Sequence, residues 1–308
     1  METGFFRLRT ESGKSVIYKK TNTYNLEHYL IEHFGICHYG NSRRSRFRIW
    51  LNNLAEVKDY SESVVRSCFN NIRAITHLAR KQKFLTDDPG EDITMPITKV
   101  AETPVMSLEQ SLSLLGAITD LHDLCLMFIG IFSGPRASEA MGFQWKSWTG
   151  ESLVPHGTAV EGKFYKGRVK SKASRRPIVV PELVRPVIEA WRRICPDSSP
   201  EALMFPPSDV GSARVKPYRV TRRTSLGGAS VRSRRKLGIP DRLVTFQVMR
   251  RSLGTHMQDH GTLKDTQGAL RHASITTTGN MSTCRWSRRA SCERSTLTPT
   301  RYSMAGPR

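Results

Sequence analysis

Acidic side chains are scarce relative to basic ones in this chain of 308 residues. Lysine and arginine together number 48, against 27 aspartates and glutamates, so the formal net charge is +21. Solubility alone does not require so large an excess, and we therefore expect a polyanionic partner, with nucleic acid as the first hypothesis. A basic surface that contacts only solvent is the alternative.

Long apolar runs and paired cysteines are missing as well. The longest apolar run, Leu124 to Phe132, is far too short to cross a bilayer, and the chain does not begin with a charged and then apolar leader. We therefore expect a soluble, cytoplasmic protein with no membrane partner. The six cysteines form no CxxC pair, which predicts neither a metal site nor a disulfide framework; they are Cys37, Cys68, Cys125, Cys195, Cys284 and Cys292.

The last segment, residues 281–308, lacks the apolar residues that an amphipathic helix needs. It holds six arginines, one acidic residue and a single leucine, and no isoleucine, valine or phenylalanine. We interpret it as an atypical basic tail, and both disorder and a shifted reading frame are open explanations.

Two domains suit a chain of this length. A stripe of apolar residues at steps of three and four predicts a long helix that begins near Asp59 or Ser61; it comprises Val65, Cys68, Ile72, Ile75 and Ala79. A polar, proline-bearing linker follows at residues 92–104. We place an N-terminal helical domain at residues 1–98 and a second domain at residues 104–280.

The second domain begins with three helix signals. Ser107 and Gln110 have the spacing of a capping box, and the apolar stretch 121–132 predicts a buried helix. The sequence Ser133-Gly134-Pro135 ends that helix, and proline suits the first position of the next one. Arg136 is then expected in a first helical turn, where free backbone N–H groups favour an anion.

Residues 163–169 and 177–181 read as two strands, joined by the basic sequence KSKASRR at residues 170–176. The simplest prediction is a β-hairpin with a lysine at its tip. An amphipathic helix is expected at 183–194. After Pro240, another helix carries Gln247 and Arg250 on one face, and a helix capped by Thr262 brings His272 to its C-terminal end.

An arginine after Ser-Gly-Pro, a lysine-bearing turn, and a polar-x-x-Arg helix followed by Arg-His occur here in that order. Together they resemble the tyrosine site-specific recombinases, the phage-integrase family, over most of residues 108–280. The resemblance implies a mainly α fold with a small β-sheet, in which an N-terminal helical core-binding domain clamps DNA and a mixed domain is catalytic. It also implies recombination or integration through a 3′-phosphotyrosyl intermediate.

The same resemblance implies double-stranded DNA as partner, a homotetramer on two DNA sites, and no metal or other cofactor. By position, Arg136 matches the first arginine, which clamps a phosphate oxygen, and Glu139 supports the fold around it. Arg250 matches the second arginine, and His272 matches the histidine that donates to the phosphate or helps to deprotonate the tyrosine. Taken singly, such side chains are more often solvated surface groups.

Three further positions complete the implied site. Lys170 or Lys172 matches the general acid that protonates the leaving 5′-oxygen, and the sequence does not choose between them. Gln247 stands where the family usually has histidine. It can donate a hydrogen bond but cannot shuttle a proton.

The expected nucleophile is missing. The family's tyrosine lies nine or ten residues after this histidine, where the chain has Met281 and Ser282. Methionine has no nucleophilic oxygen, and serine lacks the lower pKa of a phenol, about 10. Tyr302 is the only tyrosine beyond His272, and it is a distant candidate in the basic tail.

A shifted reading frame near Asn280 is one hypothesis for this absence. If Ser282 is encoded by TCT, the frame that starts from the last base of the Met281 codon reads valine and then tyrosine. The nucleotide sequence decides, because the idea fails if no alternative frame encodes a tyrosine just after Asn280. A non-catalytic DNA-binding remnant is the main alternative, and an RNA-binding or structural protein is a third.

Overall fold

The computed structural model of the chain describes residues 16–34, 44–98, 104–160, 163–167, 172–206, 235–240 and 242–279. It divides into two compact units, Met1–Glu102 and Thr103–Arg308. The predicted domain limits, 1–98 and 104–280, lie near this division. Among the described residues, none of the helices is both long and apolar enough to cross a membrane.

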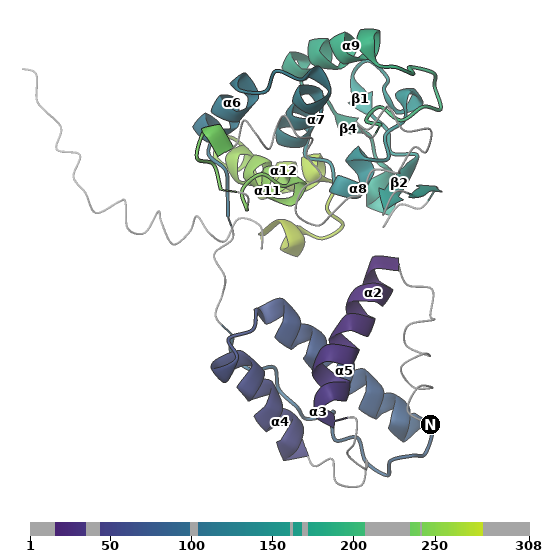
Figure 1. Cartoon of the computed structure of the whole chain (residues 1–308), viewed down its shortest axis with the longest axis vertical. Coiled ribbons are helices and arrows are strands. Elements are labelled where there is room, and N and C mark those ends of the chain that lie inside the picture. The colour runs from purple at the N-terminus through teal and green to yellow at the C-terminus, as the bar shows by residue number, and fades with distance from the viewer. Residues whose placement is uncertain are drawn as a thin grey trace, which may run out of the picture. The chain divides into compact units, whose positions relative to one another are not determined.

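All regular elements described in the first unit are helical (Figure 1). A continuous helical segment changes from α-helical to π-helical and back, and a second one ends in a π-helical turn before the long helix α5. The elements are α2 (Val16–Asn25), η1 (Leu26–Ile31), α3 (Glu32–Phe34), α4 (Arg44–Asn52), η3 (Asn53–Val57) and α5 (Glu62–Lys81).

Helix α5 confirms the apolar stripe predicted for the first unit. The five stripe residues are all buried, while basic side chains such as Arg66 and Arg73 on the other faces are exposed. The stripe packs against apolar residues of η1, α4 and η3, because a helix with one apolar face must cover it with neighbouring elements. The core of this unit includes Leu26, Leu30, Phe47, Trp50, Leu51, Leu54, Val65, Cys68 and Ile72.

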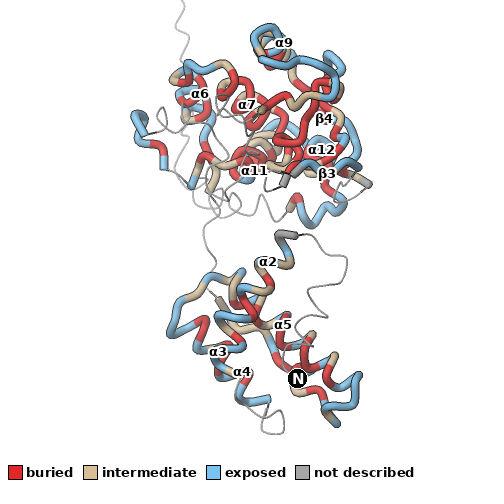
Figure 2. Tube along the Cα trace, turned by 45° about the vertical axis from the view of Figure 1, so that its right-hand side comes forward, coloured by how far each residue is buried: buried red, intermediate tan, exposed pale blue. Residues whose placement is uncertain are grey.

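The second unit is organised around α7 (Leu121–Phe132), which is buried along most of its length (Figure 2). One side of α7 packs into a core with the strands and α9, through residues such as Leu126 and Ile129. Its other side, with Met127 and Ile131, packs against α6 and α11. A helix that is apolar on all sides is expected to lie inside a domain, as predicted for 121–132.

Other helices of this unit include α6 (Leu108–Gly116), α8 (Ala137–Ala140), α9 (Arg185–Ile194), α11 (Phe246–Met257) and α12 (Leu263–Leu270), with short 3-10 turns η4 (Trp145–Ser147), η5 (Lys172–Arg175) and η6 (Glu182–Val184). The predicted capping box of Ser107 and Gln110 opens α6, with both reciprocal hydrogen bonds present. Thr262 caps α12 as expected. Helix α11 lies against α7 (Figure 1).

The strands form two small antiparallel pairs, and the predicted hairpin is wrong. Strand β3 (Lys163–Lys166) pairs with the preceding β2 (Gly157–Val160), and Gly157 lies opposite Lys166. Strand β4 (Ile178–Val179) pairs with β1 (Ser152–Leu153). Strands β3 and β4 therefore do not form a hairpin with each other, because each pairs with a different strand, and η5 lies between them in the sequence. The mainly α fold class with a small β component is confirmed.

Candidate functional site

Arg136 lies at the junction between α7 and α8, where the chain turns sharply. Gly134 has a φ of 57° and lies in the left-handed region, which glycine occupies without steric cost. Arg136 is the residue that caps α8, and Pro135 precedes the cap. The expectation that proline occupies the first helical position is therefore wrong, and the four-residue α8 is too short to provide a strong helix dipole.

Glu139 is a buried carboxylate, 2% exposed, that fixes the conformation of Arg136. Its Oε2 accepts a hydrogen bond from the backbone N–H of Arg136 at 3.0 Å, and its Oε1 accepts one from Nη1 of Arg136 at 2.9 Å. Burial alone raises the pKa of the Glu139 carboxyl, but contacts with Arg271 and Arg136 outweigh burial and lower it. Glu139 therefore carries a negative charge beneath the arginines.

Arg250, on α11, is almost fully buried, with 6% exposed. Its guanidinium donates to the backbone carbonyls of Gly134 and Leu270, which joins the turn before α8 to the end of α12. Burial, followed by the nearby Arg136, lowers the pKa of Arg250. Among the described residues, no carboxylate forms an ion pair with Arg250. Its hydrogen bonds go to carbonyl oxygens, and the Glu139 charge, which raises the pKa of Arg250, only partly offsets burial, so an added anion would be stabilised here.

His272 follows α12 and is also buried. Its Nδ1 is 2.9 Å from the hydroxyl oxygen of Thr278, and its carbonyl accepts a hydrogen bond from Nε2 of Gln267 at 3.2 Å. Burial, with smaller effects from the charges of Arg250, Arg136 and Arg271, lowers the pKa of His272 to about 4. The imidazole is therefore neutral at physiological pH, with Nδ1 engaged by Thr278.

Gln247 lies one helical turn before Arg250 on α11, but its side chain is exposed, whereas Arg250 is buried. The site network described above does not include Gln247. The spacing places both residues on one side of the helix, as expected for positions i and i+3. Its role therefore stays a prediction.

The lysine-bearing segment reaches the site through its second half. Lys170 lies outside the described residues, and Lys172 begins η5, although the position of its side chain is not described. Ser174, in the same turn, accepts a hydrogen bond from Nη1 of Arg136 through its hydroxyl at 3.1 Å. The backbone of η5 is thus held beside Arg136, and the choice between the two lysines stays open.

The basic tail, with Met281, Ser282 and Tyr302, lies outside the described residues. The description ends at Gly279, one residue after Thr278 contacts His272. The absence of a tyrosine from positions 281 and 282 is therefore a statement about the sequence alone.

Arg271 belongs to this network, although the sequence pattern did not assign it a role. It has φ 53° and ψ 45°, and its side chain is 2% exposed. Its Nη2 donates to Oε2 of Glu139 at 2.6 Å, and its Nη1 donates to the carbonyl of Ser174 at 2.9 Å. The available signal was an arginine directly after a helix end, where glycine is the usual residue.

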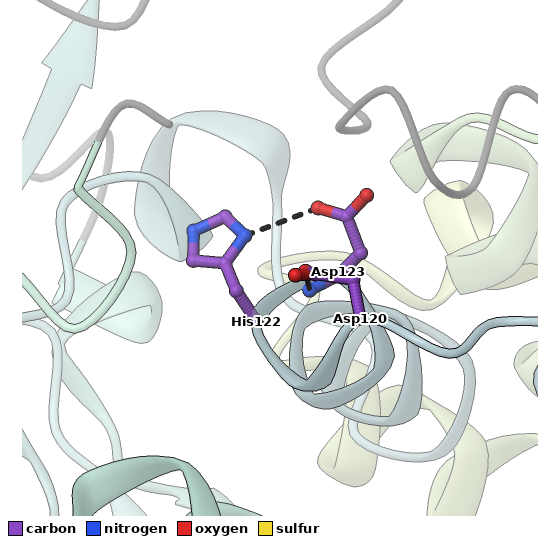
Figure 3. Close-up of side chains that lie close together, drawn as sticks. All are labelled: Asp120, His122 and Asp123. Carbon is purple, nitrogen blue, oxygen red and sulfur yellow. Dashed lines mark hydrogen bonds and ion pairs between the residues drawn. The ribbon is translucent and has the colours of Figure 1, made fainter. Parts of the chain in front are cut away.

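The start of α7 holds a separate group of titratable side chains, namely Asp120, His122 and Asp123 (Figure 3). The Asp120 carboxylate caps the helix by accepting from the N–H of Asp123 at 2.9 Å, and Nδ1 of His122 is 3.0 Å from the Asp123 carboxylate. The other ring nitrogen points away from both carboxylates (Figure 3). Trp191 and Phe205 pack edge-on against the ring. These contacts account for the three side chains as a helix cap and its neighbouring ion pair.

Taken together, the site places Arg136, Arg250 and Arg271 around the single carboxylate of Glu139, beside the neutral ring of His272. Three cations around one anion leave an excess of positive charge in a largely buried region. The side chain of Arg136, 29% exposed, is the most accessible of the three guanidinium groups. This arrangement is suited to binding an anion such as a phosphate at the face of Arg136.

No protein-family model and no curated protein matches the chain. Solved structures do match its fold. The Tn1549 transposon integrase in complex with transposon right-end DNA has a TM-score of 0.74 at 17% identity, covering 94% of this chain and 98% of that one. A lambda integrase dimer bound to a COC′ core site has a TM-score of 0.64 at 11% identity, covering 97% of each chain.

A lambda integrase tetramer bound to a Holliday junction has a TM-score of 0.63 at 10% identity, covering 91% of this chain and 76% of that one. At such low identity, these similarities describe the fold. Both units of the chain are included, because the matched regions span more than nine tenths of its length. The chain therefore has the fold of the tyrosine recombinases.

Proposed function

We propose that the chain is an integrase-like protein that binds double-stranded DNA and holds one backbone phosphate with Arg136, Arg250 and His272. The observation that carries this proposal is that Arg136 and Arg250, from separate parts of the sequence, both lie near the buried Glu139, and that His272 lies close enough to both arginines for their charges to lower its pKa. The net charge of +21 supports a polyanionic partner. The biological process would be site-specific recombination or integration.

The three side chains suit different parts of the task. Arg136 is partly exposed and has a fixed orientation, so its free N–H groups can form charge-assisted hydrogen bonds with a non-bridging phosphate oxygen. Arg250 adds buried positive charge where negative charge would grow in the transition state. His272 is neutral and its Nδ1 is engaged by Thr278, so Nε2 is the nitrogen left to face the phosphate, and it donates when Nδ1 accepts from the Thr278 hydroxyl.

Strand transfer of this kind also needs a nucleophile and an acid. A tyrosine hydroxyl loses its proton, for which the neutral His272 is a proposed acceptor, and its oxygen bonds to phosphorus. The bond from phosphorus to the 5′-oxygen breaks, and the 5′-oxygen takes up a proton. Lys170 or Lys172 is the proposed proton donor, since an ammonium gives up a proton more readily than a guanidinium. With Met281 and Ser282 at the expected tyrosine positions, we propose that cleavage is impaired in this chain.

The two units have separate proposed roles. Residues 1–98 would clamp the DNA and residues 104–280 would hold the phosphate, while residues 281–308 form the atypical tail. By analogy with the lambda integrase tetramer bound to a Holliday junction, we propose that a functional form assembles as a homo-oligomer on two DNA sites. Acting on DNA, it would be cytoplasmic.

A non-catalytic DNA-binding or regulatory remnant of an integrase is the second candidate function. The specific observation in its favour is the lack of a tyrosine nine or ten residues after His272, while the arginine network is complete. Such a protein would occupy DNA sites without cutting them.

A nicked suicide duplex tests the proposal and separates the two candidates. We expect the chain to bind duplex DNA with an affinity that falls steeply with salt, and to form no covalent adduct. A covalent adduct formed by this chain would contradict the proposal that cleavage is impaired. Tyr302 would then be the candidate nucleophile, and Tyr302→Phe should abolish the adduct. Binding that does not respond to salt would contradict the DNA-phosphate proposal itself.

A further inference from the structure

We propose that Arg271 is a positioning residue of the phosphate site, which holds Glu139 and the segment 172–176 in place so that Arg136 is presented to the phosphate. The inference rests on the proposed function, because it takes a DNA phosphate as the anion. Arg271 itself is too deeply buried to be the residue that first meets DNA.

Helix α12 ends in a Schellman-type turn, in which the N–H of His272 donates to the carbonyl of Gln267 at 3.1 Å and the N–H of Arg271 donates to that of Gly268 at 3.0 Å. This turn places Arg271 in the left-handed region. Glycine is the residue that fits there without strain, so an arginine is retained only if its side chain compensates for the strain.

The side chain of Arg271 contacts two separate segments. Nη2 donates to Oε2 of Glu139 at 2.6 Å, and both side chains of this pair are 2% exposed. Nη1 donates to the carbonyls of Ser174 at 2.9 Å and Arg176 at 3.4 Å. One guanidinium thus joins the end of α12 to α8 and to the lysine-bearing segment.

Arg271 and Arg136 share two hydrogen-bond partners. Glu139 accepts hydrogen bonds from both residues, and Ser174 accepts from Arg271 through its carbonyl and from Arg136 through its hydroxyl. Both groups that orient Arg136 are therefore themselves held by Arg271. Loss of the Arg271 side chain would leave Glu139 and η5 free to shift, and Arg136 would shift with them.

A planar guanidinium is needed for this geometry. Its two terminal nitrogens lie in a fixed fork, so one faces the carboxylate while the other faces the carbonyls. Lysine carries the same charge on a single nitrogen and cannot keep this fixed division. Arg271→Lys should therefore recover the electrostatic effect on Glu139 better than it recovers the placement of η5.

The test compares Arg271→Gln, Arg271→Gly and Arg271→Lys in the full chain, with Lys264→Gln as the matched control. Lys264 is an exposed residue of the same helix, so its substitution removes an equal charge without touching the network. Three quantities are measured: the melting temperature, the Glu139 carboxyl pKa by ¹³C NMR, and the apparent dissociation constant for inorganic phosphate by ³¹P NMR.

We expect Arg271→Gln and Arg271→Gly to weaken phosphate binding about tenfold each and to raise the Glu139 pKa, because a nearby positive charge is lost. Arg271→Gly should melt at a higher temperature than Arg271→Gln, because glycine relieves the backbone strain. Arg271→Lys should recover most of the Glu139 pKa and part of the phosphate affinity, and the Lys264→Gln control should match the wild type within about twofold.

The proposal is overturned if the glycine and glutamine variants keep the wild-type phosphate affinity and Glu139 pKa, or if phosphate affinity merely follows the melting temperature. If Arg271→Gln does not fold, Arg271→Gly decides. The Glu139 readout needs no ligand. A chain that binds no duplex DNA but shows the Glu139 shift would thus contradict the proposed function and still support the role of Arg271.

Discussion

At the residue scale, the site shows how buried charges are held in this fold. Glu139 is paired with two guanidinium groups, whereas Arg250 depends on carbonyl oxygens. Removing one partner of a buried ion pair typically destabilises a protein by about 3–5 kcal/mol, because the other charge is left uncompensated. Variants of Arg136, which is partly exposed, should be easier to interpret than variants of Arg250.

The depressed pKa of His272 predicts a pH-dependent stability. Its folded value of about 4 lies below the ordinary 6.5, so the unfolded chain binds this proton first as the pH falls. The contribution of His272 to the free energy of unfolding should be fully present above about pH 6.5. It should be lost as the pH falls toward 4, which lowers the free energy of unfolding by on the order of 1–3 kcal/mol. Urea unfolding at pH 7 and pH 4.5 measures this loss of free energy of unfolding, and the loss should be smaller in His272→Gln. An equal decline in both proteins would contradict the assignment.

Gly134 provides a second residue-scale prediction. Its backbone has a φ of 57°, which strains any residue with a side chain. A Cβ added here would lie 2.9 Å from a side-chain atom of Leu253 and 3.4 Å from one of Leu270. Gly134→Ala should therefore lower the free energy of unfolding by about 2 kcal/mol or more, from strain and overpacking together. Gly150→Ala is the control, since Gly150 also has a positive φ but a Cβ would meet nothing within 4 Å. Equal losses in the two variants would show that packing around Gly134 is unimportant.

At the element scale, helices were predictable because their signals are local. The stripe of α5, the apolar length of α7 and the capping box of α6 each occur within one stretch of sequence. The strand pairing could not be predicted in this way, because β1 and β4 have only two residues each and pair across more than twenty intervening positions. Arg271 was missed for a related reason, since its left-handed conformation and its contacts with Glu139 and Ser174 depend on the tertiary structure.

The start of α7 gives an element-scale prediction. If Asp120 acts as a helix cap and not as a metal ligand, Asp120→Ala should cost about 1 kcal/mol of stability, and a chelator should leave the melting temperature of the wild type unchanged. Thermal unfolding with and without EDTA, and after addition of zinc or magnesium, measures both effects. A clear fall with EDTA, or a rise with metal that Asp120→Ala abolishes, would contradict the helix-cap account.

At the scale of the whole molecule, a mainly α chain of two units combines a net charge of +21 with an arginine site organised by one carboxylate. The fold similarity extends over both units, while the catalytic roles of individual residues stay predictions. Loss of one preorganised donor in a site of this kind typically costs on the order of 100- to 1000-fold in rate. In the proposed site Gln247 stands in place of a histidine, and this exchange should cost less, because glutamine can still donate.

The central claim is that Arg136 contacts a DNA phosphate, and duplex affinity measured over a range of salt concentrations tests it most directly. Arg193→Gln is the matched control, because Arg193 is an exposed arginine on α9, outside the site network. We expect Arg136→Gln to weaken binding about tenfold at low salt and to reduce the salt slope by about one, while Arg193→Gln changes neither more than slightly. Equal affinities and slopes for wild type and Arg136→Gln would contradict the account.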